Sequence, residues 1–276
     1  MTNPILESMQ RFGEANGKGL TVQDTRWRYY ALGRGPAVVW MTGGLRRAAF
    51  GFAFLERLAR RHRVVAPDYP PLMTFDSMAA GFDAILQAEG LDRFALGGQS
   101  YGGLMAQGYL VRRPKAVVRL VLSSTGPANY GPLWGLLGGL VITLARVLPE
   151  RSMKRMLAAG SGKVLSTPGG EHDEWQAALE HVVENDLTRA DVVSHFAVAA
   201  DHIRSRRVNP QALAAWPGRV VVLTAANDPT QSPKDVQAYG ALFGKPPEVL
   251  SLGMLGHTAA LQDPAAYVEI LEQALT

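Results

Sequence analysis

Short apolar runs alternate with segments of helical spacing along the first 126 residues and again after residue 210. Apolar runs bounded by turn residues are typical of buried strands, whereas apolar residues three and four positions apart predict helices. Their alternation predicts a parallel sheet with helices on both faces. The predicted strands are Thr25–Ala31, Ala37–Met41, Arg63–Ala66, Phe94–Gly97, Val117–Leu122, Arg219–Leu223 and Glu248–Leu252, and the predicted helices are Phe50–Arg61, Phe75–Gln87, Ser100–Val111, Ser232–Phe243 and Pro264–Ala274.

Between about Pro127 and Pro210 the strand pattern stops, and only helical spacing of apolar residues remains. An all-helical block between two strands of a sheet predicts a cap over the edge of that sheet. We therefore expect a core of residues 1–126 and 211–276, with a helical cap of residues 127–210 inserted into it.

The composition is that of a folded globular chain. Of 276 residues, 47% are hydrophobic and 19% are charged, which excludes a disordered chain and permits a sizeable core. The formal charge of +4 comes from scattered basic clusters without interleaved aromatic residues, so we expect no nucleic-acid partner. Because cysteine is absent, disulfides, thiol nucleophiles and cysteine-based metal sites are excluded.

One uncharged segment, Val121–Ala145, raises the question of a membrane span. Its helical part starts only near Pro132 and meets Arg146 before reaching the roughly 20 residues that a span requires. We therefore expect Pro132–Leu148 to be an apolar helix of the cap and not a membrane span. Association of this helix with a membrane surface is a compatible alternative to the expected absence of a membrane partner. Residues 1–15 lack the pattern of an export signal, which makes the cytoplasm the expected location.

The strongest chemical signal is Gly98-Gln99-Ser100-Tyr101-Gly102, directly after a predicted strand and before a predicted helix. A sharp strand-to-helix turn strains its central residue and leaves room only for small residues two positions away on either side. Such a turn exposes the Ser100 hydroxyl at a helix N-terminus, whose partial positive charge favours a developing oxyanion. Ser100 is therefore the predicted nucleophile.

A serine nucleophile needs a base, and the base needs a carboxylate to orient it. His257 follows a predicted strand in a glycine-flanked loop, and Asp228 follows another, although Asn-Asp-Pro there also suits a turn or a helix cap. Because ligands bind beyond the carboxyl ends of parallel strands, we expect Ser100, Asp228 and His257 to meet at one edge of the sheet. Surface or packing roles are the expectation for the histidines of the insert, which are His172, His181, His195 and His202.

A fourth element, Thr42-Gly43-Gly44-Leu45, ends at the same predicted edge. Its glycines let the backbone approach a substrate closely. We predict that the backbone N–H groups of Gly44 and Tyr101 form an oxyanion hole, with Leu45 as the alternative to Gly44.

In its order of serine, acid and histidine, and in its helical interruption, the sequence resembles the α/β-hydrolase family over nearly its whole length. Asp68-Tyr69-Pro70, Ala106-Gln107 and Arg112-Arg113-Pro114 look most like the maspardin-like branch. The resemblance implies a mostly parallel, doubly wound α/β-hydrolase sheet, a triad of Ser100, Asp228 and His257, and neither cofactor nor metal. Thr42 stands at the position of the oxyanion loop where many relatives have histidine, which is a departure from the family pattern. No histidine follows Asp68 at motif spacing, so we expect Asp68 to be structural.

These features predict a serine hydrolase that cleaves a carboxylic ester or lactone, including macrolactones, of a small lipophilic substrate. The apolar helix Pro132–Leu148 is expected to pack on its neighbours or to cover a lipophilic pocket, with Trp134 and Leu137 as candidate substrate contacts. A serine at the turn disfavours epoxide hydrolases and haloalkane dehalogenases, whose relatives use aspartate. The alternatives are a cofactor-free C–C hydrolase, perhydrolase or acyltransferase, and a non-catalytic maspardin-like binding protein.

Overall fold

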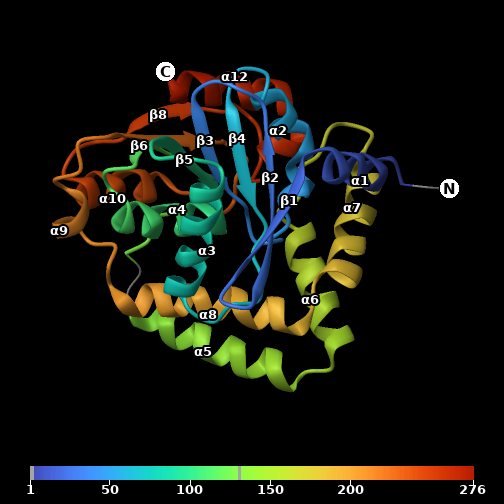
Figure 1. Ribbon diagram of the computed structural model, residues 1–276. Coiled ribbons are helices and arrows are strands. Elements are labelled where there is room, and N and C mark those ends of the chain that lie inside the picture. Colours follow the sequence, from blue (N-terminus) through green and yellow to red (C-terminus); the bar gives the residue numbers. More distant parts are fainter. Residues whose placement is uncertain (1–2, 130–131) are drawn as a thin grey trace.

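The computed structural model describes residues 3–129 and 132–276, and the side chains of these residues except 132–136. The strands in this part of the chain are β1 (Gly17–Val22), β2 (Thr25–Leu32), β3 (Ala37–Met41), β4 (Arg63–Pro67), β5 (Phe94–Gln99), β6 (Val117–Ser123), β7 (Arg219–Thr224) and β8 (Glu248–Ser251). They form one sheet in the order β1-β2-β4-β3-β5-β6-β7-β8 (Figure 1). The strands β3 to β8 run parallel, and β1 and β2 are antiparallel to their neighbours. The predicted mostly parallel sheet is confirmed.

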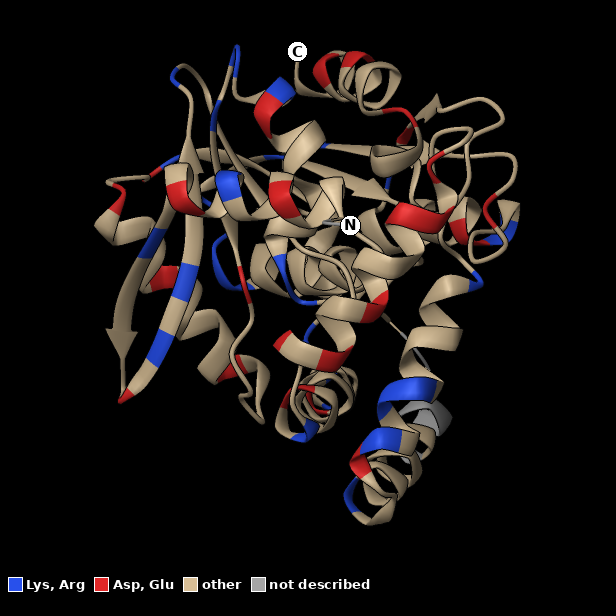
Figure 2. Ribbon diagram, turned by 90° about the vertical axis from the view of Figure 1, so that its right-hand side faces the viewer, with Lys and Arg blue, Asp and Glu red and all other residues tan. Residues whose placement is uncertain are grey.

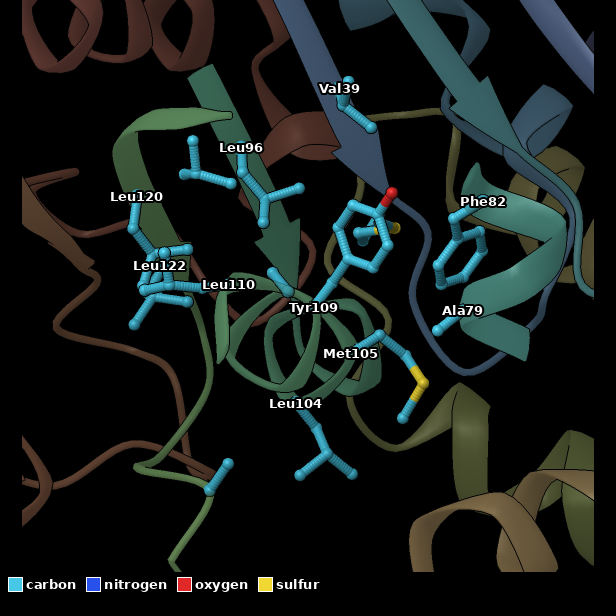
Figure 3. Close-up of a cluster of buried hydrophobic side chains, with 14 of the residues drawn as sticks. Val39, Ala79, Phe82, Leu96, Leu104, Met105, Tyr109, Leu110, Leu120 and Leu122 are labelled. Carbon is cyan, nitrogen blue, oxygen red and sulfur yellow. The ribbon is translucent and has the colours of Figure 1, made fainter. Parts of the chain in front are cut away.

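Helices cover both faces of this sheet, as the doubly wound fold requires. The helices of the core are α1 (Pro4–Asn16), the 3-10 turn η1 (Ala48–Gly51), α2 (Phe52–Leu58), α3 (Phe75–Ala88), α4 (Tyr101–Arg112), α9 (Pro210–Leu213), α10 (Pro233–Phe243), α11 (Ala259–Gln262) and α12 (Pro264–Leu275). Buried side chains of α3, α4 and α10 pack on one face, and those of α1, α2 and α12 pack on the other. Figure 3 shows the first cluster, where Tyr109 of α4 and Phe82 of α3 lie beside strand residues such as Leu96.

Local sequence sets the ends of the helices that follow the strands. Thr74 caps α3 by accepting a hydrogen bond from the backbone N–H of Ser77. Ser232 and Asp235 form a capping box at the start of α10, and Gly244 ends that helix in the left-handed conformation. These caps fix where the chain leaves the sheet edge on its way into each covering helix.

The insert between β6 and β7 contains α5 (Pro132–Val147), α6 (Glu150–Gly162), α7 (His172–His181), the short π-helix η2 (Val182–Asp186) and α8 (Arg189–Ser205). Figure 1 shows α5 and α8 side by side beneath the core, with α6 and α7 beside them. The Asp201 carboxylate of α8 accepts a hydrogen bond from the backbone N–H of Phe75, which ties the insert to α3. Among the described residues, no helix has both the length and the apolar character needed to cross a membrane.

Charged residues are interspersed over the core elements on the side shown in Figure 2. A group of basic residues lies at the junction of α5 and α6, beside exposed apolar side chains such as Val147 and Met156. One of them, Lys154, pairs with Glu150 at 3.3 Å. The basic residues of this group are Arg146, Arg151, Lys154 and Arg155.

Candidate active site

The turn between β5 and α4 has the strained geometry that its sequence predicts. Ser100 has φ 54° and ψ −120°, in the left-handed region that non-glycine residues avoid. A Cβ at Gly98 would overlap the carbonyl group of Gly102, and a Cβ at Gly102 would overlap the carbonyl oxygen of Met41. The two glycines are therefore required, because the chain folds back on itself and on β3 at this point.

Asp228 and His257 meet in the loops that follow β7 and β8. The His257 Nδ1 atom lies 3.1 Å from the Asp228 Oδ1 atom, and both side chains are buried. The two loops are held together by a bridge between Asn227 and Gly256 and by a hydrogen bond from the Asn227 N–H to the Leu255 carbonyl. The sheet register therefore determines which residues of the two loops face each other.

Thr230 completes this pair and was not singled out from the sequence. Its hydroxyl oxygen lies 2.7 Å from Asp228 Oδ1 and 2.8 Å from His257 Nδ1, and its backbone N–H also donates to the Asp228 carboxylate. Asp228 therefore both shapes a turn and orients the histidine, so the two readings of its sequence are compatible. A threonine two residues after the acid was the available signal.

The surroundings of Asp228 keep it ionised and set the His257 tautomer. Burial opposes the charged form, but hydrogen bonds from His257 and Thr230 outweigh it and hold the pKa of Asp228 below its usual range. A carboxylate only accepts hydrogen bonds, so the proton of neutral His257 belongs on Nδ1. The other ring nitrogen, Nε2, is then free to accept a proton.

Ser100 and His257 line one cavity of about 550 Å³, without a direct hydrogen bond between them in this structure. Such contacts are commonly loose in the absence of substrate. Most of the wall is apolar and comes from the core and from α6 and α7. Among the apolar residues that line it are Trp40, Phe54, Leu104, Leu157, Leu179 and Leu261.

The predicted oxyanion loop borders the same cavity. Gly44, Leu45 and Tyr101 all line it, and Gly44 and Leu45 form a turn closed by the Arg46 N–H and the Gly43 carbonyl at 3.0 Å. Within the described residues, no hydrogen bond uses the backbone N–H of Gly44 or of Tyr101. Both groups are therefore available to an oxygen atom in the cavity.

Two polar side chains hold this loop in place. Thr42 donates to the Pro67 carbonyl at 3.1 Å and accepts, at its own carbonyl, the Tyr69 hydroxyl at 2.8 Å. Gln99 donates to the His257 carbonyl at 3.1 Å, and its side-chain oxygen lies close against Gly43. Thr42 thus anchors the loop to the end of β4, and Gln99 joins the loop, the serine turn and the histidine loop.

The next two residues of the loop, Arg46 and Arg47, connect it to α8 of the insert. Arg46 is 1% exposed, donates to Ser194 at 3.0 Å, and has its Nε atom 3.8 Å from the Asp191 carboxylate. Arg47 approaches the same carboxylate to 3.3 Å. The segment Arg46–Arg47 therefore joins the oxyanion loop to α8 through a hydrogen bond and two ion pairs. Nothing in the spacing of these residues along the chain indicates the contact.

Three further residues were considered from the sequence, Asp68 as a structural residue and Leu137 and Trp134 as substrate contacts, and their outcomes differ. Asp68 is buried and accepts the Ala48 N–H at 2.6 Å, which supports the structural role expected for it. Leu137 is not brought to the cavity, because its side chain is 50% exposed and does not line the wall. The side chain of Trp134 lies outside the described residues. In the described part of the chain, no cluster of three His, Asp or Glu side chains is suited to a metal ion.

A doubly wound sheet with a strained serine turn and an Asp–His pair at its carboxyl edge defines a hydrolase-type protein. The model of the alpha/beta hydrolase family matches residues 35–270, and the chain belongs to that family. Among curated proteins, no sequence match is found.

Solved structures agree with this assignment of the fold. A hydrolase from Pseudomonas aeruginosa PA01 is similar, with 20% identity, a TM-score of 0.74, and coverage of 94% of this chain and 98% of the other. A thermophilic esterase from Thermogutta terrifontis has 19% identity and a TM-score of 0.72 over 94% and 97% of the two chains. A meta-cleavage product hydrolase has 15% identity and a TM-score of 0.70 over 94% and 98%. At such identities the likeness establishes the fold alone.

Proposed function

We propose that the protein is a serine hydrolase that cleaves a carboxylic ester or lactone of a fairly lipophilic substrate through an acyl-enzyme. The observation that carries this proposal is that Ser100 and His257 line the same cavity, and that Asp228 accepts a hydrogen bond from His257 Nδ1 on the side of the ring away from Nε2. A strained serine, a histidine with a free Nε2, and two unpaired backbone N–H groups are the parts that acyl transfer requires.

The first half of the reaction forms the acyl-enzyme. His257 Nε2 takes the proton of the Ser100 hydroxyl as its oxygen attacks the carbonyl carbon. The backbone N–H groups of Gly44 and Tyr101 stabilise the oxyanion, and each such donor typically contributes about 3 kcal/mol to the transition state. When the intermediate collapses, the alcohol leaves and receives the proton from the His257 imidazolium.

The second half releases the acid. His257 removes a proton from water, whose oxygen attacks the acyl carbonyl, and the proton then returns to Ser100. Asp228 stays ionised throughout and stabilises the imidazolium formed in each half. With a lactone the leaving alcohol stays attached to the acyl group, so the product is a single hydroxy acid.

The apolar wall of the cavity supports a lipophilic acyl group. Side chains of Trp40, Phe54 and Leu104 come from the core, and Leu157 comes from the insert, so an acyl chain would be enclosed by both. Burial of apolar surface favours binding by about 25 cal/mol for each Å². Rates for a series of esters of increasing chain length, with lactones and amides beside them, measure this preference.

Labelling with a fluorophosphonate probe tests the nucleophile directly. The Ser100 oxygen displaces fluoride from phosphorus, so we expect one covalent adduct at Ser100, found by peptide mass spectrometry. Ser100→Ala should abolish the adduct and His257→Ala should strongly reduce it, whereas Ser8→Ala, at a partly exposed position of α1, serves as the matched control. An adduct at another serine, or none, would contradict the proposal, and the latter result would favour a maspardin-like binding protein.

Reactions other than ester hydrolysis are separated by product analysis. A C–C hydrolase, a perhydrolase and an acyltransferase would all give the Ser100 adduct, since each of these relatives keeps a serine at the turn. Cleavage of a dienone carbon–carbon bond, formation of a peracid with added peroxide, or an ester formed with added alcohol would identify them. Plain acid release from esters and lactones, with none of these products, is the expected result.

A further inference from the structure

The described part of the insert places two polar side chains on the cavity wall, Ser161 and His195, and the acyl-transfer chemistry above uses neither; the larger of them is His195. His195, on α8, lines the cavity and stacks on the ring of Tyr101 with centroids 4.0 Å apart and planes inclined by 24°. A Cβ built on Gly44 would lie 3.4 Å from the Cε1 atom of His195. The imidazole therefore lies beside both residues that supply the oxyanion donors.

The imidazole of His195 is uncharged, and its ring nitrogens have no hydrogen-bond partner among the described residues. Burial, with a smaller contribution from the Arg46 charge, lowers the pKa of His195 to about 3. A neutral imidazole offers one N–H donor and one nitrogen acceptor. Among the described residues, neither ring nitrogen makes a hydrogen bond, although the His195 backbone carbonyl accepts the Tyr101 hydroxyl at 3.2 Å. An unpaired polar group against apolar walls is unfavourable unless a water or a ligand satisfies it.

Contacts of two neighbouring residues, Ser194 and Asp191, hold this part of α8 next to the oxyanion loop. The preceding residue, Ser194, accepts a hydrogen bond from Arg46 and donates to the Leu72 carbonyl. Asp191, one turn earlier, pairs with Arg46 and Arg47 of the oxyanion loop. In Figure 1, α8 lies between α5 and the core, and His195 of this helix lines the cavity. The contacts hold the imidazole at one place on the cavity wall.

We propose that His195 is a specificity residue that hydrogen-bonds a hydroxyl or keto oxygen on the acyl group, close to the scissile carbonyl. This inference rests on the proposed function and narrows it to hydroxy- or oxo-substituted esters and lactones. Because Gly44 and Tyr101 hold the carbonyl oxygen, a ring beside them reaches substituents one or two carbons away. The uncharged ring pairs with a neutral oxygen and gives no ionic attraction to a carboxylate.

The test compares three esters that differ only at one carbon. The esters are ethyl octanoate, ethyl 3-hydroxyoctanoate and ethyl 3-oxooctanoate, and acid release is followed in a pH-stat. Each kcat/KM is divided by the rate constant for alkaline hydrolysis of the same ester, which removes differences in intrinsic reactivity. The wild-type protein should prefer at least one oxygen-bearing ester by about tenfold, the size expected for one hydrogen bond in a dry site.

Variants then assign the preference to the imidazole. His195→Phe keeps an aromatic ring against Tyr101 but removes both polar atoms, so the corrected ratio should fall to about one. His195→Gln, whose amide both donates and accepts, should restore part of it. His181→Phe, an exposed histidine on α7, should keep the wild-type ratio.

The outcomes separate this inference from the function on which it rests. A wild-type protein that hydrolyses all three esters without preference, or a preference that survives in His195→Phe, overturns the specificity role alone. Labelling at Ser100 without hydrolysis of any of these esters also overturns it. If the protein shows no labelling at Ser100 and hydrolyses none of the esters, the proposed function is overturned as well.

Discussion

The two walls of the active-site cavity are built by different means. On the core wall, Ser100, Asp228 and His257 follow three parallel strands, and the pairing of those strands fixes their relative positions. On the opposite wall, residues of α6 and α8 are placed by helix packing and by a few polar contacts with the oxyanion loop. In the proposed function, the core wall holds the reacting groups, and we propose that the cap wall holds a group that selects what reacts.

The two regions also differ in how much of their apolar surface is buried. Two large clusters of buried side chains lie on the two faces of the sheet, and the second also takes in residues of α7 and η2 such as Trp175, Leu179 and Val183. A much smaller cluster in the cap joins Ala145, Met153, Val192 and Val193. Exposed apolar residues gather on α5 and α6 and include Leu137, Leu140, Leu144, Val147 and Met156. With less buried surface, α5 and α6 are expected to open at a lower free energy than the core elements.

The largest effect is expected from a change on the core wall. Asp228→Asn removes the negative charge that fixes the Nδ1–H tautomer of His257, and the new amide favours the opposite tautomer. We expect kcat for ester hydrolysis to fall by about 10⁴-fold. Some stability is also lost, because the hydrogen bonds that lower the pKa of Asp228 stabilise the folded state. Asp263→Asn, at an exposed helix cap where asparagine is equally favourable, should leave kcat unchanged. A loss below tenfold in Asp228→Asn would show that Asp228 does not orient the base.

The next largest effect concerns the contact between the two walls. Asp191→Ala leaves Arg46 buried without its carboxylate and removes the capping box with Thr188 at the start of α8. We expect the free energy of unfolding to fall by about 3 kcal/mol, because a buried charge loses its partner. Asp191→Asn keeps an acceptor for the cap and should lose less. Denaturant titration measures both, and an Asp191→Asn variant as stable as the wild-type protein would mean that the cap bond, rather than the ion pair, provides the stability.

Much of the core wall can be predicted from sequence, because β3, β5, β6 and β7 are buried on both faces. A strand of this kind appears as a short apolar run, and the residue that follows it is found at the carboxyl edge. The prediction misses β1, whose six residues Gly17–Val22 form a largely exposed edge strand with two glycines and no apolar run. Without an apolar run, nothing in the local pattern separates such a strand from a loop.

The cap wall could not be predicted in the same way. The segment Arg46–Arg47 contacts α8 through residues far apart in the chain, Asp191 and Ser194, and such contacts have no local signature. His195 lies three residues after Val192, on the apolar side of α8, and a polar residue at such a position is a usable signal. Its neighbours along the helix do not reveal that this side faces the oxyanion loop.

A smaller effect is a pH dependence of folding stability, which we predict for Asp68, the carboxylate on the core side of the Arg46–Arg47 segment. Asp191, on the cap side, pairs with these arginines, whereas Asp68, on the core side, holds the Ala48 N–H. Burial, only partly offset by this hydrogen bond and by nearby arginines, raises the pKa of Asp68 to about 6, from 3.8 in the unfolded chain. The folded state therefore keeps a proton that the unfolded state has already lost between these two values.

The sign of the pH dependence follows from this difference. Between pH 4 and pH 6 the folded state binds more protons, so stability falls as pH rises and levels off above pH 6. The difference of about two pKa units corresponds to at most about 3 kcal/mol. Relative to Asp68→Asn, which does not titrate, the wild-type protein should lose stability across this window, whereas Asp24→Asn, at an exposed turn, should show a constant gap. Unfolding free energies at pH 4, 5, 6 and 7 measure both gaps. A constant gap for Asp68→Asn as well would mean that the pKa of Asp68 is the same in the folded and unfolded states, and that burial does not raise it.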